Sequence, residues 1–163
     1  MTVGNDSKVL QNIREILLKT KKTIATAESV TSGNLQVFLS HAKDASRFFQ
    51  GGITTYNIGQ KYKHLSVEPI HAAECNCVSE KVAREMAMYS CKLFSSDYGL
   101  GITGYASKQP ENNINELYAF IAIAEKDKIL LSEKLLPQSE DSIEIQEYYS
   151  LRLLERFCQI VKT

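Results

Sequence analysis

The chain has 163 residues, with 19 Lys and Arg against 19 Asp and Glu, and 44% of its residues are hydrophobic. This length is sufficient for one domain with a buried core, so we predict a single domain over residues 1–163. The balanced charge disfavours binding to nucleic acid, which requires a surplus of Lys and Arg on one face. The N-terminal segment is too polar for a signal peptide, and no apolar run approaches the roughly 18–20 residues that span a bilayer.

The N-terminal part of the chain predicts two helices with a strand between them. Apolar residues recur at helical spacing from a cap at Asp6 to about Lys21. The β-branched, alternating segment Thr23–Ala27 then predicts a strand. After a short polar turn, apolar side chains recur at helical spacing over residues 35–42. This order indicates a strand, a tight turn and a helix.

The rest of the chain continues the alternation of strands and helices. The predicted elements are a strand Ile53–Tyr56, a polar helix over residues 57–65, a long helix capped by Ser79, a strand Tyr98–Thr103, a hairpin of strands Leu117–Ala124 and Ile129–Leu136, and a final helix from about Asp141. Alternation without a linker predicts an α/β fold with three α/β/α layers. In this fold, helices cover both faces of a mixed, mostly parallel sheet.

Polar residues follow the first predicted strand in the segment Ala27-Glu28-Ser29-Val30-Thr31-Ser32-Gly33. Ligands of α/β folds collect outside the carboxyl ends of the strands, and the N-terminus of the next helix offers N–H groups to an anion. A phosphate or an oxyanion would fit at this turn. Alternatively, Thr31 or Ser32 only caps the helix, and Gly33 only permits close packing.

The second predicted strand also delivers polar groups to its end. Tyr56 supplies a phenol, Asn57 an amide and Lys61, one helical turn later, an ammonium group, while the preceding Gly51-Gly52 pair permits close backbone approach. Tyr56 and Lys61 would then face one site together with Thr103, which ends the neighbouring strand. Alternatively, Tyr56 packs with its hydroxyl in water and Lys61 is solvated.

The sequence predicts no metal site and no other cofactor. His71, Cys75 and Cys77 lack a second ligand pair at any usual zinc spacing, so we interpret them as structural cysteines and a surface histidine. His41 and His64 have no obvious partners. The four cysteines are too few and too unevenly spaced for a disulfide framework, which favours reduced thiols and a cytoplasmic protein that binds no membrane.

Four segments, in the same order and at similar distances, resemble the signature of the CinA C-terminal domain family, known also as nicotinamide-mononucleotide deamidases. The segments are Ala27-Glu28-Ser29-Val30-Thr31-Ser32-Gly33, Gly51-Gly52-Ile53-Thr54-Thr55-Tyr56 with Lys61, Val78-Ser79-Glu80-Lys81-Val82-Ala83-Arg84-Glu85-Met86-Ala87, and Thr103-Gly104-Tyr105-Ala106. The resemblance covers nearly the whole chain.

This resemblance implies an α/β/α domain that hydrolyses the carboxamide of nicotinamide mononucleotide to nicotinate mononucleotide and ammonia, without a metal. It implies that Ser29 is the nucleophile or positions water, and that Tyr56 is an acid, a base or an orienting phenol. The implied substrate-binding residues are Thr31, Ser32, Gly33, Lys61, Thr103 and Gly104. The implied partners are a small nucleotide or amide and further copies of the chain, because members of the family commonly self-associate.

The chain also departs from the family signature. Val30 and Ser32 replace a cysteine and a glycine, and residues 107–113 replace a short glycine-proline loop. Glu140 and Glu144 stand where two arginines are expected, and a carboxylate repels a phosphate that an arginine would bind. Arg47, Lys61 and Lys108 are the cations that could take over this role. Two functions therefore stay open: an amidohydrolase for a nicotinamide-type nucleotide or a related small amide, and a non-catalytic relative that binds a ligand or a partner.

Overall fold

The computed structural model describes residues 7–161, which form one five-stranded sheet with helices on both faces. The elements in chain order are α1 (Lys8–Thr20), β1 (Ile24–Glu28), α2 (Asn34–Ser40), η1 (Ala45–Arg47), β2 (Phe49–Thr54), α3 (Ile58–Leu65), α4 (Pro69–Glu74), α5 (Glu80–Phe94), β3 (Tyr98–Gly104), η2 (Pro110–Asn112), β4 (Ala119–Glu125), β5 (Lys128–Leu135) and α6 (Ser142–Ile160). The predicted helix cap at Asp6 lies outside the described residues.

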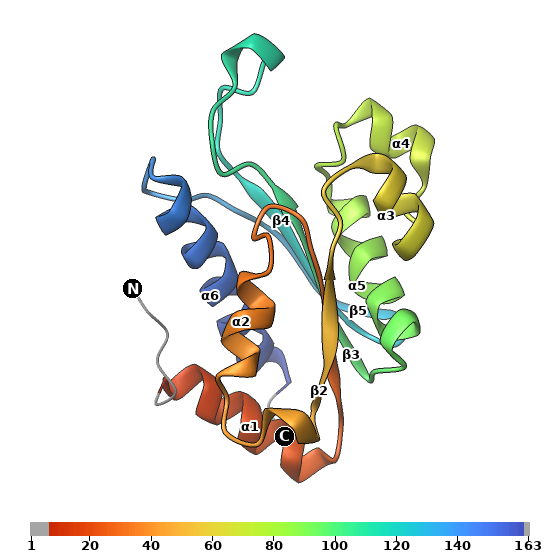
Figure 1. Ribbon diagram of the computed structural model, residues 1–163, viewed down its shortest axis with the longest axis vertical. Coiled ribbons are helices and arrows are strands. Elements are labelled where there is room, and N and C mark those ends of the chain that lie inside the picture. Colours follow the sequence, from red (N-terminus) through yellow and green to blue (C-terminus); the bar gives the residue numbers. More distant parts are fainter. Residues whose placement is uncertain (1–6, 162–163) are drawn as a thin grey trace.

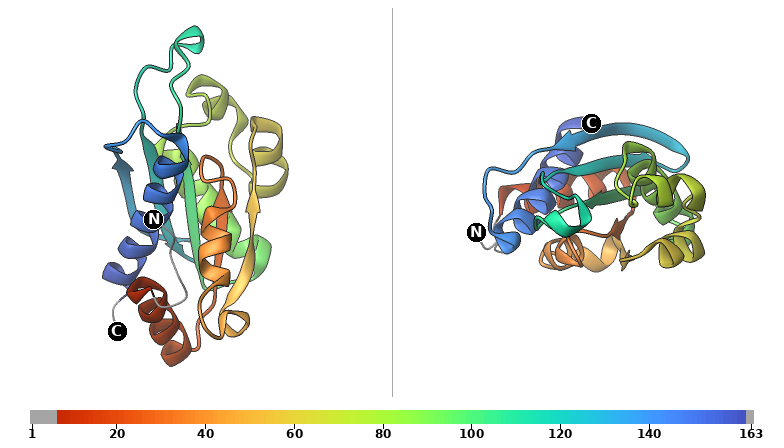
Figure 2. Two further views of the ribbon diagram at one scale, coloured as in Figure 1. Left: turned by 60° about the vertical axis from the view of Figure 1, so that its left-hand side comes forward. Right: turned by 90° about the horizontal axis from the view of Figure 1, so that it is seen from above.

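The three predicted layers are confirmed. Helices α1, α2 and α6 cover one face of the sheet, and α3, α4 and α5 cover the other (Figure 1). Seen from above, the sheet runs between these two sets of helices (Figure 2). No helix of the described part of the chain combines the length and hydropathy of a membrane-spanning segment. None of the four cysteines forms a disulfide.

The sheet is mixed, as predicted. Its order is β2-β1-β3-β4-β5, with β1 parallel to both β2 and β3, and with antiparallel pairing from β3 to β4 and from β4 to β5. Strands β1, β2, β3 and β5 therefore point in one direction and β4 in the other. This arrangement brings the carboxyl ends of β1, β2 and β3 to one edge of the sheet, where ligands of such folds bind.

The second strand begins earlier than the sequence predicted, at Phe49 instead of Ile53, and it ends at Thr54. The Gly51-Gly52 pair therefore lies inside β2. Prediction from strand propensity relies on β-branched and aromatic side chains. It missed this part of the strand because glycine has neither. A Cβ atom at Gly52 would lie only 2.2 Å from Oγ1 of Thr26 on the adjacent β1, so close packing requires glycine here.

Helix α5 packs directly on the central strands. Its N-cap is the predicted Ser79, whose Oγ accepts the N–H of Val82. Two glycines of β3 allow close contact, because a Cβ at Gly99 or Gly101 would lie 2.1 or 2.3 Å from a backbone carbonyl oxygen of α5. This close packing fixes β3, and with it the end of the strand that carries Thr103.

Candidate functional site

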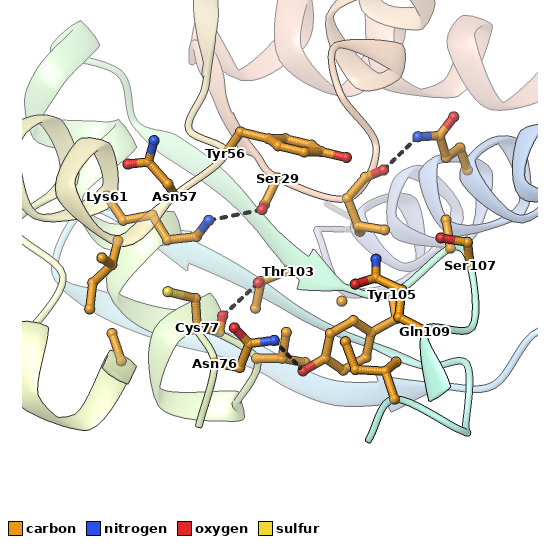
Figure 3. Close-up of a pocket in the computed structure, with 18 of the residues that line it drawn as sticks. Ser29, Tyr56, Asn57, Lys61, Asn76, Cys77, Thr103, Tyr105, Ser107 and Gln109 are labelled. Carbon is orange, nitrogen blue, oxygen red and sulfur yellow. Dashed lines mark hydrogen bonds between the residues drawn. The ribbon is translucent and has the colours of Figure 1, made fainter. Parts of the chain in front are cut away.

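A cavity of about 670 Å³ opens at the carboxyl ends of β1, β2 and β3. Ser29 follows β1, Tyr56 follows β2, and Thr103 and Gly104 end β3, so all three strands contribute to its wall (Figure 3). Its volume lies within the range of about 300–1,000 Å³ that is common for small-molecule sites. The sequence prediction that these three segments meet is therefore confirmed.

Lys61 contacts Ser29 directly inside the protein. The side chain reaches inward from α3 and is only 1% exposed, so the alternative of a solvated lysine is wrong. Its Nζ donates a hydrogen bond of 2.9 Å to Oγ of Ser29 (Figure 3). It donates a second one of 2.8 Å to the carbonyl oxygen of Thr55. The Thr55 carbonyl thus holds the amine against the serine hydroxyl.

The pKa of Lys61 is lowered, because burial penalises the charged ammonium form more than the nearby Cys77 favours it. No carboxylate among residues 7–161 forms an ion pair with it. A buried amine without a carboxylate partner loses its proton more readily than an exposed lysine. In its neutral form it can accept the hydroxyl proton of Ser29 along the same 2.9 Å contact.

Tyr56, Thr103 and Gly104 also line the cavity. The Tyr56 side chain is 70% exposed, so its phenol lies at the open side of the site. Thr103 is buried, and its Oγ1 donates a 2.7 Å hydrogen bond to the carbonyl oxygen of Cys77. That bond connects the end of β3 to the loop before α5. The hydroxyl oxygen of Thr103 can still accept a hydrogen bond from a ligand. The catalytic or binding roles of these three residues stay predictions.

Thr31, Ser32 and Gly33 lie outside the cavity wall, and the turn that they form binds an internal anion instead. The carboxylate of Glu28, which is fully buried, accepts hydrogen bonds from Oγ1 of Thr31 and from the N–H groups of Gly33, Leu35 and Gln36, at 2.6–3.1 Å. The first turn of α2 is therefore capped by Glu28, and not by Thr31 or Ser32. The external phosphate or oxyanion expected at this helix end is replaced by a side chain of the protein.

Several residues of the cavity wall were not found from the sequence. They come from the loop before α5, the loop after β3 and the start of α6, and they include Asn76, Cys77, Tyr105, Ser107, Gln109, Ser142 and Gln146. Gln146 donates a 2.8 Å hydrogen bond from Nε2 to the carbonyl oxygen of Val30, and Asn76 donates one of 3.1 Å to the Tyr105 hydroxyl. Most of these side chains lie far from Ser29 in the sequence, and no local signal predicts that they line the cavity. Asn57, Cys77 and Tyr105 belong to segments that the sequence singled out, but they were not predicted as site residues.

The model of the CinA C-terminal domain family matches residues 6–158. The chain belongs to this family. It is 36% identical over 147 residues to a Mycoplasma genitalium protein, covering 89% of this chain and 92% of that one. It is 34% identical over 126 residues to a competence-damage inducible protein of Streptococcus equi subsp. zooepidemicus, where the match covers 77% of this chain. The chain spans only about 30% of the length of that streptococcal relative.

Solved structures of CinA superfamily proteins share the fold. The Enterobacter asburiae competence or damage-inducible protein superposes with a TM-score of 0.89 at 21% identity, covering 99% of each chain. The Escherichia coli CinA superfamily protein superposes with a TM-score of 0.87 at 26% identity, covering 97% of this chain and 90% of that one. The α/β architecture is therefore that of the CinA superfamily.

The two glutamates that replace the expected arginines of the CinA signature lie outside the cavity wall. Glu140 forms a 2.6 Å ion pair with Lys108, and Glu144 accepts a 2.6 Å hydrogen bond from the hydroxyl of Ser139. Arg47 directly precedes β2, so it lies at the amino end of this strand, whereas the cavity lies at the carboxyl end. Of the three cations considered as replacements, only Lys61 lines the cavity.

The described part of the chain offers no evident metal site. Within residues 7–161, no three His, Cys, Asp or Glu side chains gather closely enough to hold a metal ion. Nε2 of His71 instead lies 2.8 Å from Oγ of Ser79, at the cap of α5. The polar side chains of the cavity wall carry hydroxyl, amine, phenol, thiol and carboxamide groups.

Proposed function

We propose that this CinA domain is an amidohydrolase that releases ammonia from the carboxamide of a nicotinamide-type compound or a related small amide. The observation that carries the proposal is the 2.9 Å contact between Oγ of Ser29 and the buried Nζ of Lys61. A serine next to an amine with a lowered pKa is an activated nucleophile with its own base. The family resemblance supports the choice of a carboxamide as substrate.

In the proposed reaction, the neutral Lys61 amine takes the hydroxyl proton of Ser29 while Oγ attacks the carboxamide carbon. The Lys61 ammonium then returns the proton to the leaving nitrogen, which departs as ammonia, and an acyl ester remains on Ser29. Water that is deprotonated by the same amine cleaves the ester. This second step yields the carboxylate and restores both residues. The role assigned to the Tyr56 phenol, which lines the cavity, is to orient the bound amide.

The test is an ammonia-release assay with the wild type, Ser29→Ala and Lys61→Met. Loss of the nucleophile or its base should lower kcat by at least on the order of 10³-fold, as in other enzymes whose nucleophile and base act as a unit. The matched controls are Ser40→Ala at the end of α2 and Lys63→Met on α3, both exposed and outside the cavity, which should keep full activity. Unchanged turnover in Ser29→Ala would overturn the assignment of the nucleophile. Absence of ammonia release from every amide offered would favour a non-catalytic ligand-binding relative.

A further inference from the structure

The cavity wall is nearly devoid of acidic and basic side chains. Among the described residues that line it, Lys61 is the only amine, and none is an Arg, His, Asp or Glu. The remaining polar groups of the wall are the hydroxyls of Ser29, Tyr56, Thr103, Tyr105, Ser107 and Ser142 and the carboxamides of Asn57, Asn76, Gln109 and Gln146. Such groups recognise uncharged hydrogen-bonding partners and do not neutralise an anion.

We propose that this site, if it is the amidohydrolase site described above, takes a carboxamide that carries hydroxyl groups but no phosphate or other anionic group. A phosphate monoester brings a charge of about −1.5 to −2 at neutral pH. Burying it without a matching cation is unfavourable, because the lost hydration is not replaced. The substrate class that fits is an unphosphorylated, sugar-bearing or otherwise neutral polar amide.

Lys61 cannot serve as the missing phosphate-binding cation and also act as the base. Its Nζ already donates to Oγ of Ser29 and to the carbonyl oxygen of Thr55. A phosphate next to it would favour the ammonium form and keep the amine protonated. The protonated amine could not accept the hydroxyl proton of Ser29. Binding an anion at this position would therefore inhibit the reaction that the contact supports.

The helix ends near the cavity do not supply the missing positive charge. The N–H groups at the start of α2 are bound by the Glu28 carboxylate, and those of Ile143 and Glu144 at the start of α6 are bound by the Asp141 carboxylate at 3.0 Å. The start of α3 is capped by the neutral Asn57. A single free helix end corresponds to only about half an elementary charge, which is small against a phosphate dianion.

A second cavity of about 920 Å³ adjoins the first and is acidic. The two share Asn76, Tyr105, Gln109 and Ile114, and the second is lined further by Glu111 and Glu116 and by three asparagines. A substrate that extends beyond the first cavity in this direction meets two carboxylates and several carboxamides. These groups repel an anion and can hydrogen-bond the hydroxyls of a sugar.

The test uses two compounds that differ only in the phosphate, nicotinamide riboside and nicotinamide mononucleotide. Their dissociation constants are measured by calorimetry on Ser29→Ala, so that binding is compared without turnover. We expect the riboside to bind at least about tenfold more tightly. Equal or tighter binding of the mononucleotide, or no binding of either compound at millimolar concentration, would overturn this inference. Ammonia release by the wild type is measured separately and decides the proposed function alone.

A charge variant tests the physical reason for the selectivity. Gln109→Arg adds a cation to the part of the wall that both cavities share, and Gln109→Met is the matched control without charge. The arginine should raise the affinity for the mononucleotide relative to the riboside by about tenfold, whereas the methionine should not change this ratio. If neither variant changes the ratio, charge is not what excludes the phosphate, and the argument fails.

Discussion

The side chain of Lys61 is among the largest fully buried side chains of the described chain, together with aromatic and aliphatic residues. An amine is costly to bury, because it must be either neutral or paired with hydrogen-bond acceptors. Lys61 has two acceptors, Oγ of Ser29 and the Thr55 carbonyl oxygen. A methionine of similar length would fill the same space without that cost. The lysine is therefore better explained by chemistry than by stability.

Burial of Lys61 makes the stability of the protein depend on pH. A folded-state pKa below the ordinary value of 10.5 means that the unfolded chain keeps the proton at a pH where the folded chain has lost it. Between the folded pKa and about 10.5, the free energy of unfolding of the wild type should rise with pH relative to Lys61→Met, by up to about 1.4 kcal/mol per pH unit. Below the folded pKa the difference should be constant. Urea unfolding of both proteins from pH 6 to about 10.5 measures it.

Lys63→Met is the control for this measurement. Lys63 is exposed on the same helix, so its replacement should leave the pH dependence of unfolding unchanged. A constant difference between wild type and Lys61→Met over the whole range would contradict the lowered pKa.

The packing of α5 against β3 depends on positions without side chains. A Cβ at Gly101 would lie 2.3 Å from the carbonyl oxygen of Ala83 and 2.6 Å from the backbone nitrogen of Ala87. Both are backbone atoms of a regular helix, which cannot move away singly. The whole helix would have to shift, and with it the contact between the two elements.

Gly101→Ala should therefore destabilise the protein by about 1–3 kcal/mol, the usual range for overpacking of a core. Gly59→Ala is the matched control, because a Cβ at that position in α3 meets only Oδ1 of Asn57, at an ordinary 3.5 Å. Alanine is also the better helix former, so this control should be neutral or more stable by up to about 1 kcal/mol. Denaturant midpoints of the two variants measure the contrast, and equal stability of both would contradict it.

Most elements could be predicted from periodicity, since their signals are local. The hairpin of β4 and β5, the long α5 behind Ser79 and the start of α6 at Asp141 lie within a few residues of the prediction. Periodicity did not predict the first half of β2, because the Gly51-Gly52 pair there has no side chains that could show a pattern. Helix α2 itself was predicted, but its cap was not, because the cap comes from Glu28 at the end of the preceding strand, outside the usual N-cap position.

At the scale of the whole molecule, the cavity is built by segments that the sequence does not connect. Parallel topology explains why Ser29, Tyr56 and Thr103 could be predicted to meet, because the strands that carry them end at one edge. Gln146 reaches the Val30 carbonyl from α6, 116 residues away. This contact depends on how α6 returns across the sheet, which local patterns do not encode. The inward direction of Lys61 likewise follows from packing and not from spacing.

Exposed apolar side chains lie on both helical layers of the molecule. Leu136 and Ile143 flank the segment that leads into α6 and are 63% and 66% exposed. Tyr62 and Ile70 are exposed on α3 and α4, which cover the other face. Large apolar side chains at the surface are typical of contact sites between protein subunits when they gather in a patch.

We expect the chain to self-associate through one of these two surfaces, and light scattering at micromolar concentration should give a multiple of 18.3 kDa. Ile143→Lys and Ile70→Lys each place a charge on one surface, and a charge in an apolar interface without a partner is unfavourable. One of the two variants should lower the measured mass toward that of the monomer, and the other serves as its control because it lies on the opposite layer. A wild-type mass of 18.3 kDa would contradict self-association, and an unchanged mass in both variants would place the interface elsewhere.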